Sequence, residues 1–277
     1  RVVAESGQTL EVCRACGRSL VGRNRGTFII PEFGFVTSLK PPAKPGEARP
    51  ERTYTTRTYY SGESKESDRI ALPLGQVTLV AIPASDGELA VINHAGYQGF
   101  KVCHNCGYTL LGNEPVQSPH ETPWRTDCSG TLTRFYLGHE FKTDILQLRF
   151  EGSANAKRGF WLSLLYALLE GASGALDIDR RDLDGCLYPY AGDPSMPALV
   201  LFDEVPGGAG HVRRIAHDED TLTSVLKAAL KKLEGCDCGG EQRNTSCYGC
   251  LRNYRNQFCH DELERGVVID FFKALGL

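Results

Sequence analysis

Closely spaced cysteines constrain this 277-residue chain more than any other feature of its sequence. Eight of the eleven cysteines form four pairs: Cys13–Cys16, Cys103–Cys106, Cys236–Cys238 and Cys247–Cys250. When two thiols on one tight turn meet two on another, they supply the four ligands of a tetrahedral zinc site. A disulfide framework is not expected, because the first residues lack the character of a secretory signal. The spacing therefore predicts a fold held by structural zinc.

The C-terminal cysteines predict a zinc site with no open coordination position. Cys236, Cys238, Cys247 and Cys250 fall within fifteen residues, the pattern of a structural rather than a catalytic site. The alternative is a set of buried thiols without metal, which seldom pair so regularly. Cys259 is expected to be a core thiol, although it could replace Cys236 or Cys238.

The N-terminal half predicts a second zinc site, for which two arrangements are open. In the first, the two CxxC turns share one metal ion: Cys13, Cys16, Cys103 and Cys106. In the second, the later turn binds together with Cys128 and His120, and the earlier turn pairs with ligands upstream of this chain. We favour the second, because it uses Cys128 and suits a piece of a longer protein, as the absence of an initiator Met also suggests.

Hydrophobic periodicity divides the chain near residue 150. The segments 77–83 and 88–93 predict a hairpin around Ser85-Asp86-Gly87. Further along, helices are predicted at 154–169, 218–233 and 265–275, and strands at 175–179, 185–190 and 198–202. The expected fold class is α+β, with a β-rich, zinc-stapled part at 1–150 and a mixed α/β, helix-rich zinc-binding domain at 151–277. No apolar run approaches the ~18 residues that cross a bilayer, so no membrane partner is expected.

Charge gives only a weak indication of a partner. The net charge of −3 does not indicate a nucleic-acid-binding protein as a whole. Residues 1–60 carry ten Lys and Arg against five Asp and Glu, so this segment could contact phosphate. A solvated basic face is an equally good interpretation.

An apolar strand followed by Asp203-Glu204 is similar to the magnesium-binding strand of nucleotide hydrolases. That chemistry also needs a phosphate loop, GxxxxGK[ST], which the chain lacks, so ATP hydrolysis by this chain alone is not expected. Gly207 to Gly210 could hold an anion through backbone amides, but a tight turn from strand to helix is the better prediction.

A metal-dependent nuclease is the rival enzymatic hypothesis. Its metal would be held by acidic residues between 177 and 204: Asp177, Asp179, Asp182, Asp184, Asp203 and Glu204. No Glu-x-Lys follows an acidic strand and no His-x-Lys pair exists, so a solvated acidic turn is the preferred interpretation. No catalytic residue is predicted.

Arg252, Tyr254 and Arg255 follow the last cysteine pair directly and are the predicted nucleic-acid-binding residues. Two guanidinium groups and an aromatic ring beside a rigid metal site suit phosphates and bases. Packing against the metal turn is the alternative.

Two motifs together resemble a known family. Residues 198–211, ALVLFDEVPGGAGH, and residues 246–257, SCYGCLRNYRNQ, resemble the C-terminal zinc-binding domain of MrfA-type superfamily 2 DNA helicases, and a similar domain in DrmB-like proteins of the DISARM phage-defence system. The resemblance implies that Cys236, Cys238, Cys247 and Cys250 bind structural zinc. It also implies an ATP-driven motor upstream of this region.

The expected function is that of a non-catalytic zinc-binding C-terminal region of a cytoplasmic DNA helicase or translocase, which supports or guides DNA in repair or phage defence. The full-length protein would be an ATP-dependent helicase. Its partners would be DNA, bound weakly and non-specifically, and the upstream motor domains or a partner subunit. Beside the nuclease, a protein-interaction platform without DNA contact remains an alternative.

Overall fold

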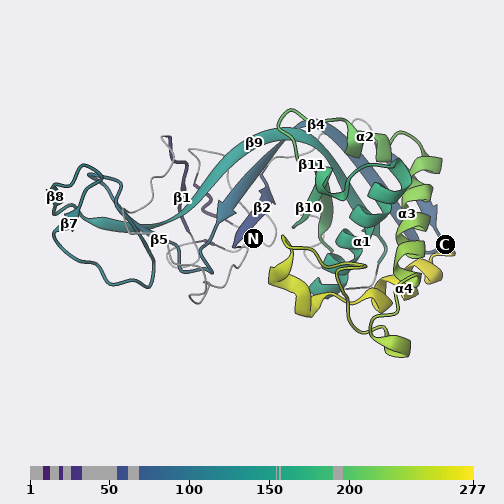
Figure 1. The fold of residues 1–277 in the computed structure, drawn as a ribbon. Coiled ribbons are helices and arrows are strands. Elements are labelled where there is room, and N and C mark those ends of the chain that lie inside the picture. The colour runs from purple at the N-terminus through teal and green to yellow at the C-terminus, as the bar shows by residue number, and fades with distance from the viewer. Residues whose placement is uncertain are drawn as a thin grey trace. The chain divides into compact units, whose positions relative to one another are not determined.

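The computed structural model describes residues 9–12, 19–20, 26–32, 55–61, 69–153, 155, 157–189 and 196–277. It confirms the α+β class. The chain forms two compact units (Figure 1). Unit 1 comprises Arg1–Val21, Thr58–Ala90 and Glu140–Leu277, and unit 2 comprises Gly22–Arg57 and Val91–His139.

The division into units does not follow the predicted boundary at residue 150. Two long strands, β4 (Val77–Asn93) and β9 (Leu132–Glu151), each have residues in both units. The chain therefore enters unit 2 and returns from it along paired strands. Composition along the sequence does not reveal such a path.

The main sheet has the strand order β10-β11-β9-β4-β2, and β3 pairs with β4. Its remaining bounds are β2, Thr56–Tyr60; β3, Ile70–Leu74; β10, Leu183–Tyr188; and β11, Ala198–Asp203. All six residues of β11 are buried, and β11 is antiparallel to both β10 and β9. The strand predicted at 198–202 is therefore confirmed, and it lies inside the sheet between β10 and β9.

The hairpin predicted around Ser85-Asp86-Gly87 is wrong, because β4 continues through this segment as one strand. A two-residue type I′ turn needs positive φ at both central residues. Here Asp86 has a φ of 58°, but Gly87 is not in the positive region. At Gly87 a Cβ would lie 2.5 Å from Cγ2 of Ile145, so the glycine instead allows close packing within the sheet.

Among the described residues, unit 1 contains four α-helices: α1 (Arg158–Leu176), α2 (His211–Ile215), α3 (Glu219–Glu234) and α4 (Arg265–Ala274). Short 3-10 helices lie at Arg180–Asp182, Gly240–Gln242 and Gln257–Glu262. Asp218 caps α3, its side chain accepting a hydrogen bond from the Thr221 amide at 2.7 Å. α3 and α4 confirm the helices predicted at 218–233 and 265–275.

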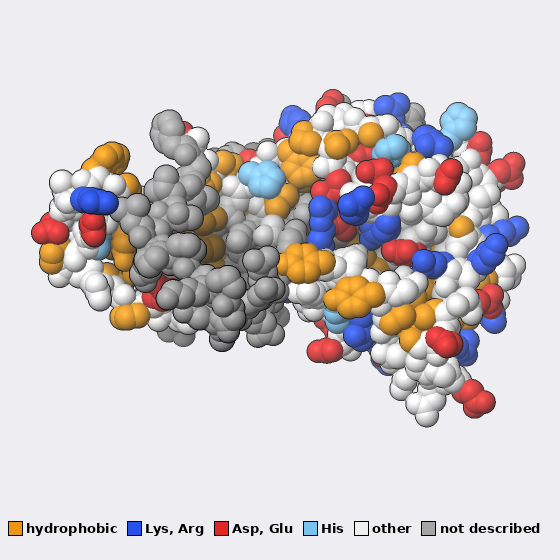
Figure 2. All heavy atoms as spheres, viewed as in Figure 1, with side chains coloured by type: hydrophobic (Ala, Val, Ile, Leu, Met, Phe, Trp, Pro, Cys, Tyr) orange, Lys and Arg blue, Asp and Glu red, His pale blue; other side chains and the backbone are white. Residues whose placement is uncertain are grey.

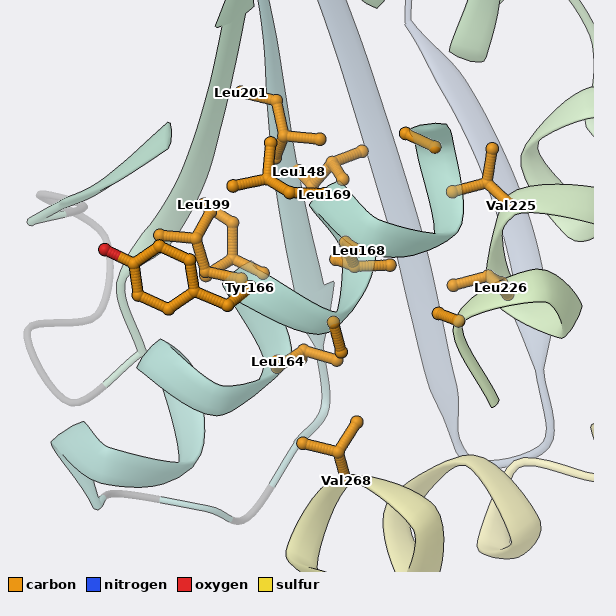
Figure 3. Packing of buried hydrophobic residues seen from close by; sticks show 14 of the residues in the cluster. Leu148, Leu164, Tyr166, Leu168, Leu169, Leu199, Leu201, Val225, Leu226 and Val268 are labelled. Atoms are coloured by element: carbon orange, nitrogen blue, oxygen red, sulfur yellow. The ribbon is translucent and has the colours of Figure 1, made fainter. Parts of the chain in front are cut away.

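The core of unit 1 surrounds α1. Figure 3 shows Leu164, Tyr166, Leu168 and Leu169 of this helix among side chains of the sheet, α3 and α4. By length and composition α1 could cross a membrane, but 67% of its most apolar window is buried inside the protein. We therefore describe it as a core helix.

The helix predicted at 154–169 begins later and continues to Leu176, so no strand forms at 175–179. It passes through Gly171, where a Cβ would lie 2.7 Å from Cβ of Ala229 on α3. This glycine lets the two helices approach closely. Asp177 then ends the helix in a left-handed conformation.

Two glycines of α1 are expected to respond oppositely to substitution by alanine. Gly171→Ala should lower the free energy of unfolding by about 1–3 kcal/mol, because the methyl group overpacks the contact with α3. Gly174→Ala should raise it by about 0.5–1 kcal/mol, because a Cβ at Gly174 would meet no other part of the described structure within 4 Å and glycine is a poor helix former. Urea unfolding of both variants measures this, and equal effects would contradict the packing described.

Unit 2 is built on the first part of β9. β5 (Phe100–Cys103) is antiparallel to both β9 and β6 (Thr109–Leu111), and β1 (Phe28–Ile29) is parallel to β9. Two further short strands, β7 (His120–Glu121) and β8 (Asp127–Cys128), form a separate hairpin. This hairpin and the end of β5 carry the second cysteine cluster.

Candidate metal centres

The C-terminal cluster has the dimensions of a tetrahedral site. The Sγ atoms of Cys236 and Cys247 lie 3.5 Å apart, those of Cys238 and Cys250 3.7 Å, and those of Cys247 and Cys250 3.9 Å. Four sulfurs at 2.3 Å from a zinc ion are about 3.8 Å from one another. All four Sγ atoms lie within 4.8 Å of each other. The donor set therefore fits one zinc ion.

Two turns present these sulfurs. The first follows α3 directly, and the second is a tight turn in which the amide of Cys250 donates to the carbonyl of Cys247 at 3.1 Å. The amides of Gly249 and Cys247 donate to the sulfurs of Cys247 and Cys250, at 3.3 and 3.2 Å. Hydrogen bonds of this kind favour the thiolate form that binds metal.

Arg265 fixes the first turn to α4. Its guanidinium group is buried and donates to the carbonyls of Cys238 at 2.8 Å, Gly240 at 3.3 Å and Leu233 at 3.4 Å. In the sequence Arg265 is only the first residue of the helix predicted at 265–275, and nothing there indicates this contact.

The N-terminal cluster unites the residues of the favoured arrangement. The Sγ atoms of Cys103 and Cys128 lie 3.8 Å apart, and Sγ of Cys106 lies 3.2 Å from Nε2 of His120. The four donor atoms again lie within 4.8 Å of one another. The set therefore fits a second structural zinc ion, and zinc as the cofactor is as expected.

The other cysteines considered lie elsewhere. Cys13 and Cys16 fall outside the described residues, and the four donors of the N-terminal cluster already complete a coordination shell without them. Cys259 is buried, with its thiol 3.2 Å from the carbonyl of Asn256, and is not part of the C-terminal cluster.

Neighbouring thiols in each cluster differ in acidity. At Cys103, burial raises the pKa, but hydrogen bonds from the backbone of Cys106 and Asn105 outweigh it and lower the pKa to about 6. Burial raises the pKa of Cys106 to about 11. The Cys103 thiolate thus forms readily, and its negative charge disfavours deprotonation of the neighbouring Cys106 thiol. A metal dication bound between the sulfurs would offset this repulsion with its positive charge, so that all the thiols that bind it could be deprotonated.

Asp203 has a structural role that its position after β11 did not reveal. Its carboxylate is fully buried and accepts hydrogen bonds from the amides of Ala209 at 2.7 Å, His211 at 3.0 Å and Val212 at 3.0 Å. Asp144, on β9, accepts a further bond from the Gly210 amide at 3.1 Å.

These contacts decide between the two interpretations of the glycine-rich segment. Amides of the loop bind carboxylates of the protein itself, and Gly207, Gly208 and Gly210 all have positive φ. The segment is therefore the predicted tight turn from strand to helix. Sequence reasoning missed Asp144, which lies sixty-six residues before its partner Gly210.

A match to a known family joins these observations. Residues 164–251 match the model of the MrfA Zn-binding domain. The resemblance inferred from the sequence is thereby confirmed, over a shorter segment than the expected 151–277. All four C-terminal cysteines fall inside the matched segment, whereas the N-terminal cluster lies outside it.

Parts of longer proteins are similar to this chain in sequence or in structure. The Druantia protein DruE of Escherichia coli (strain UMEA 4076-1) is 29% identical over 246 residues, which are 78% of this chain and 13% of DruE. The crystal structure of the DUF1998 helicase MrfA bound to DNA covers 82% of this chain with 26% of its own, at 14% identity and a TM-score of 0.43. The crystal structure of MrfA bound to DNA and AMPPNP covers 81% of this chain with 23% of its own, at 12% identity and a TM-score of 0.35. The chain thus spans about an eighth of DruE and about a quarter of MrfA.

Residues 252–256, which follow the matched segment and carry the predicted nucleic-acid-binding side chains, form no helix. Arg252 donates to the Ser246 hydroxyl at 2.9 Å and to the His260 carbonyl at 3.3 Å, so it braces the metal turn. Arg255 is ion-paired with Glu204 and lies 3.8 Å from Asp184. Tyr254 is 52% exposed.

Glu204, within the segment that matches the MrfA Zn-binding domain, makes the stability of the fold depend on pH. Burial and the nearby Asp184 raise the pKa of Glu204 from 4.5 to about 6. The folded state therefore binds a proton more tightly than the unfolded state, and this contribution to stability is lost as pH rises from 4.5 through 6. In the Glu204→Gln variant the free energy of unfolding should fall less between pH 4.5 and 6. Urea unfolding at several pH values in this range measures the difference.

Asp179→Asn is the control, because hydrogen bonds from Arg181 hold the pKa of Asp179 at about 2, below the range. This variant should keep the decline. A Glu204→Gln variant with the parent's pH profile would show that the carboxyl titrates normally.

Proposed function

We propose that this chain is a non-catalytic, zinc-stabilised region of a helicase- or translocase-like protein, in which it supports the binding of DNA. The observation that carries the proposal is the closed four-thiol centre inside the MrfA zinc-binding domain. Four protein ligands leave no position for a substrate or an activated water, so such a centre stiffens a module rather than catalysing a reaction.

The whole protein is proposed to be an ATP-dependent helicase, active in DNA repair or phage defence in the cytoplasm. Its motor would lie elsewhere in the same protein or in a partner subunit. The support is the match to a domain of MrfA, which is itself named a DNA-bound helicase. The 277 residues contain no phosphate loop, so we expect no ATP hydrolysis by this chain alone.

DNA contact is proposed to be weak and independent of base sequence. On the face of unit 1 in Figure 2, basic side chains alternate with acidic ones and form no continuous basic surface. Arg255 is proposed to exchange Glu204 for a phosphate, beside Tyr254, while Arg252 holds the metal turn in place.

Titration of labelled single- and double-stranded DNA at several salt concentrations tests the proposal. We expect a Kd on the order of 10⁻⁵ M that rises steeply with salt. Arg255→Ala should weaken binding similarly on unrelated sequences. Arg181→Ala is the matched control, because Arg181 is also exposed and also paired with a carboxylate, that of Asp179. Equal behaviour of the two variants would favour the interaction platform.

The nuclease alternative has less support. Both oxygens of the Asp203 carboxylate accept backbone hydrogen bonds, and Glu204 is paired with Arg255. Magnesium-dependent cleavage of DNA by the zinc-loaded chain, lost in Glu204→Gln, would nevertheless establish it.

A further inference from the structure

The hairpin of β7 and β8 is fixed at its base by the N-terminal cluster. His120 and Cys128 are opposite one another in the two strands, and both belong to the candidate zinc site. His120 also stacks on Tyr108, with 4.7 Å between the ring centroids. A zinc ion bound there would hold both strands at once.

The tip of this hairpin is a three-residue loop, Pro123-Trp124-Arg125. The Thr122 amide donates to the Thr126 carbonyl at 2.8 Å, and the Arg125 amide donates to the Thr122 carbonyl at 3.0 Å. Arg125 has a φ of 62°, as expected for a type I turn followed by a left-handed residue. The loop therefore has one defined conformation.

Two features of the tip are unfavourable for the isolated protein. The Trp124 side chain is 76% exposed, the most exposed large apolar side chain among the described residues. Arg125 occupies a left-handed position where glycine costs least, and an L-residue there costs about 1–2 kcal/mol. The loop thus exposes an indole, followed in sequence by an arginine, at some cost in stability, and strain of this kind concentrates at functional sites.

We propose that Trp124 is a stacking platform for a base of single-stranded nucleic acid, with Arg125 contacting the adjacent phosphate. The inference rests on the proposed DNA-supporting function and adds a residue and a substrate form to it. An aromatic ring and a neighbouring cation are the two elements of sequence-independent single-strand binding.

The surroundings of Trp124 favour a nucleotide over a protein pocket. A stable protein interface buries about 800 Å² on each partner, with an apolar centre. The exposed neighbours along the tip are Glu121, Pro123, Arg125, Thr126 and Asp127, which give no such centre. Stacking of one base needs only one face of the indole ring.

The two tryptophans of the chain make the test direct. Trp161 is 1% exposed in the core of unit 1, so a quencher or ligand in solution acts on Trp124. Oligothymidylate added to the zinc-loaded chain should quench emission from Trp124. The Trp124→Phe variant, whose emission comes from Trp161 alone, should show no quenching but should still bind.

Affinity for labelled oligothymidylate, measured by anisotropy, gives the second readout. Trp124→Ala should weaken binding by about fivefold to a hundredfold, the range for loss of one stacked base. Arg125→Gly relieves the strained φ and should lower the slope of log Kd against log salt by about 0.7. Val116→Ala, which removes another exposed apolar side chain of unit 2, should leave affinity unchanged.

The outcomes separate this inference from the proposed function. If Trp124→Ala binds DNA as tightly as the parent, and DNA does not quench the parent's emission, Trp124 is not a stacking platform. The proposed support of DNA by this chain would then still stand, and a protein pocket would be the expected partner of Trp124. No binding of any DNA at low salt would overturn both. Two zinc ions per chain in every variant confirm that the hairpin base is intact.

Discussion

We expect Cys250→Ser to remove about one zinc ion per chain and to lower the free energy of unfolding by at least ~3 kcal/mol. The unfolded chain does not arrange its thiols for a metal, so the free energy of binding zinc is largely free energy of folding. Cys250 is also buried against the core of unit 1, so loss of the metal disturbs that core directly. Elemental analysis and urea unfolding measure the two effects.

Cys259→Ala is the matched control for this substitution. Cys259 is as deeply buried as Cys250 but lies outside the cluster. The control should keep two zinc ions and lose only the stability that a smaller core side chain costs. A Cys250→Ser variant that retains two zinc ions would contradict the assignment of a zinc site to the C-terminal cluster.

Asp203→Ala should cost about 3–5 kcal/mol of unfolding free energy. The substitution leaves the amides of Ala209, His211 and Val212 without their acceptor, and one unsatisfied buried group costs about 1–3 kcal/mol. It also removes the cap of α2, so the turn from Gly207 to Gly210 should become mobile. Hydrogen exchange of the three amides and urea unfolding measure these effects.

Glu204→Gln at neutral pH is the control, because Glu204 is adjacent but accepts no backbone hydrogen bond in the contacts described. Its effect on stability should be small beside that of Asp203→Ala. If the two substitutions cost the same, or the three amides stay protected in Asp203→Ala, the carboxylate does not hold the turn.

Local patterns in the sequence predicted the parts of the fold that depend on local contacts. Paired cysteines predicted zinc, and the apolar spacing of 218–233 predicted α3. His120 was also predicted, as the fourth ligand of the arrangement that uses Cys128. These predictions depend on coordination number and helix period, both of which can be read from the sequence.

The failures have one physical cause, since they concern contacts between distant residues. Gly171 is a helix terminator by propensity, yet packing against Ala229 makes it part of α1. Asp86-Gly87 has the composition of a turn, yet sheet pairing draws it into β4. The acidic pattern that includes Asp203 predicted a solvated turn, but the Asp203 carboxylate is buried, and three amides of a following loop donate to it.

The core around α1 sets the smallest piece of the chain that should be expressed alone. Leu72, Leu79, Leu148 and Phe150, all before residue 151, belong to the same buried cluster as α1, α3 and the C-terminal cysteines. A fragment starting at residue 151 would expose the apolar face that these side chains cover, and aggregation is the expected result. The boundaries of the matched family segment are therefore a poor guide to a soluble fragment. Useful expression boundaries must include β3, β4 and β9.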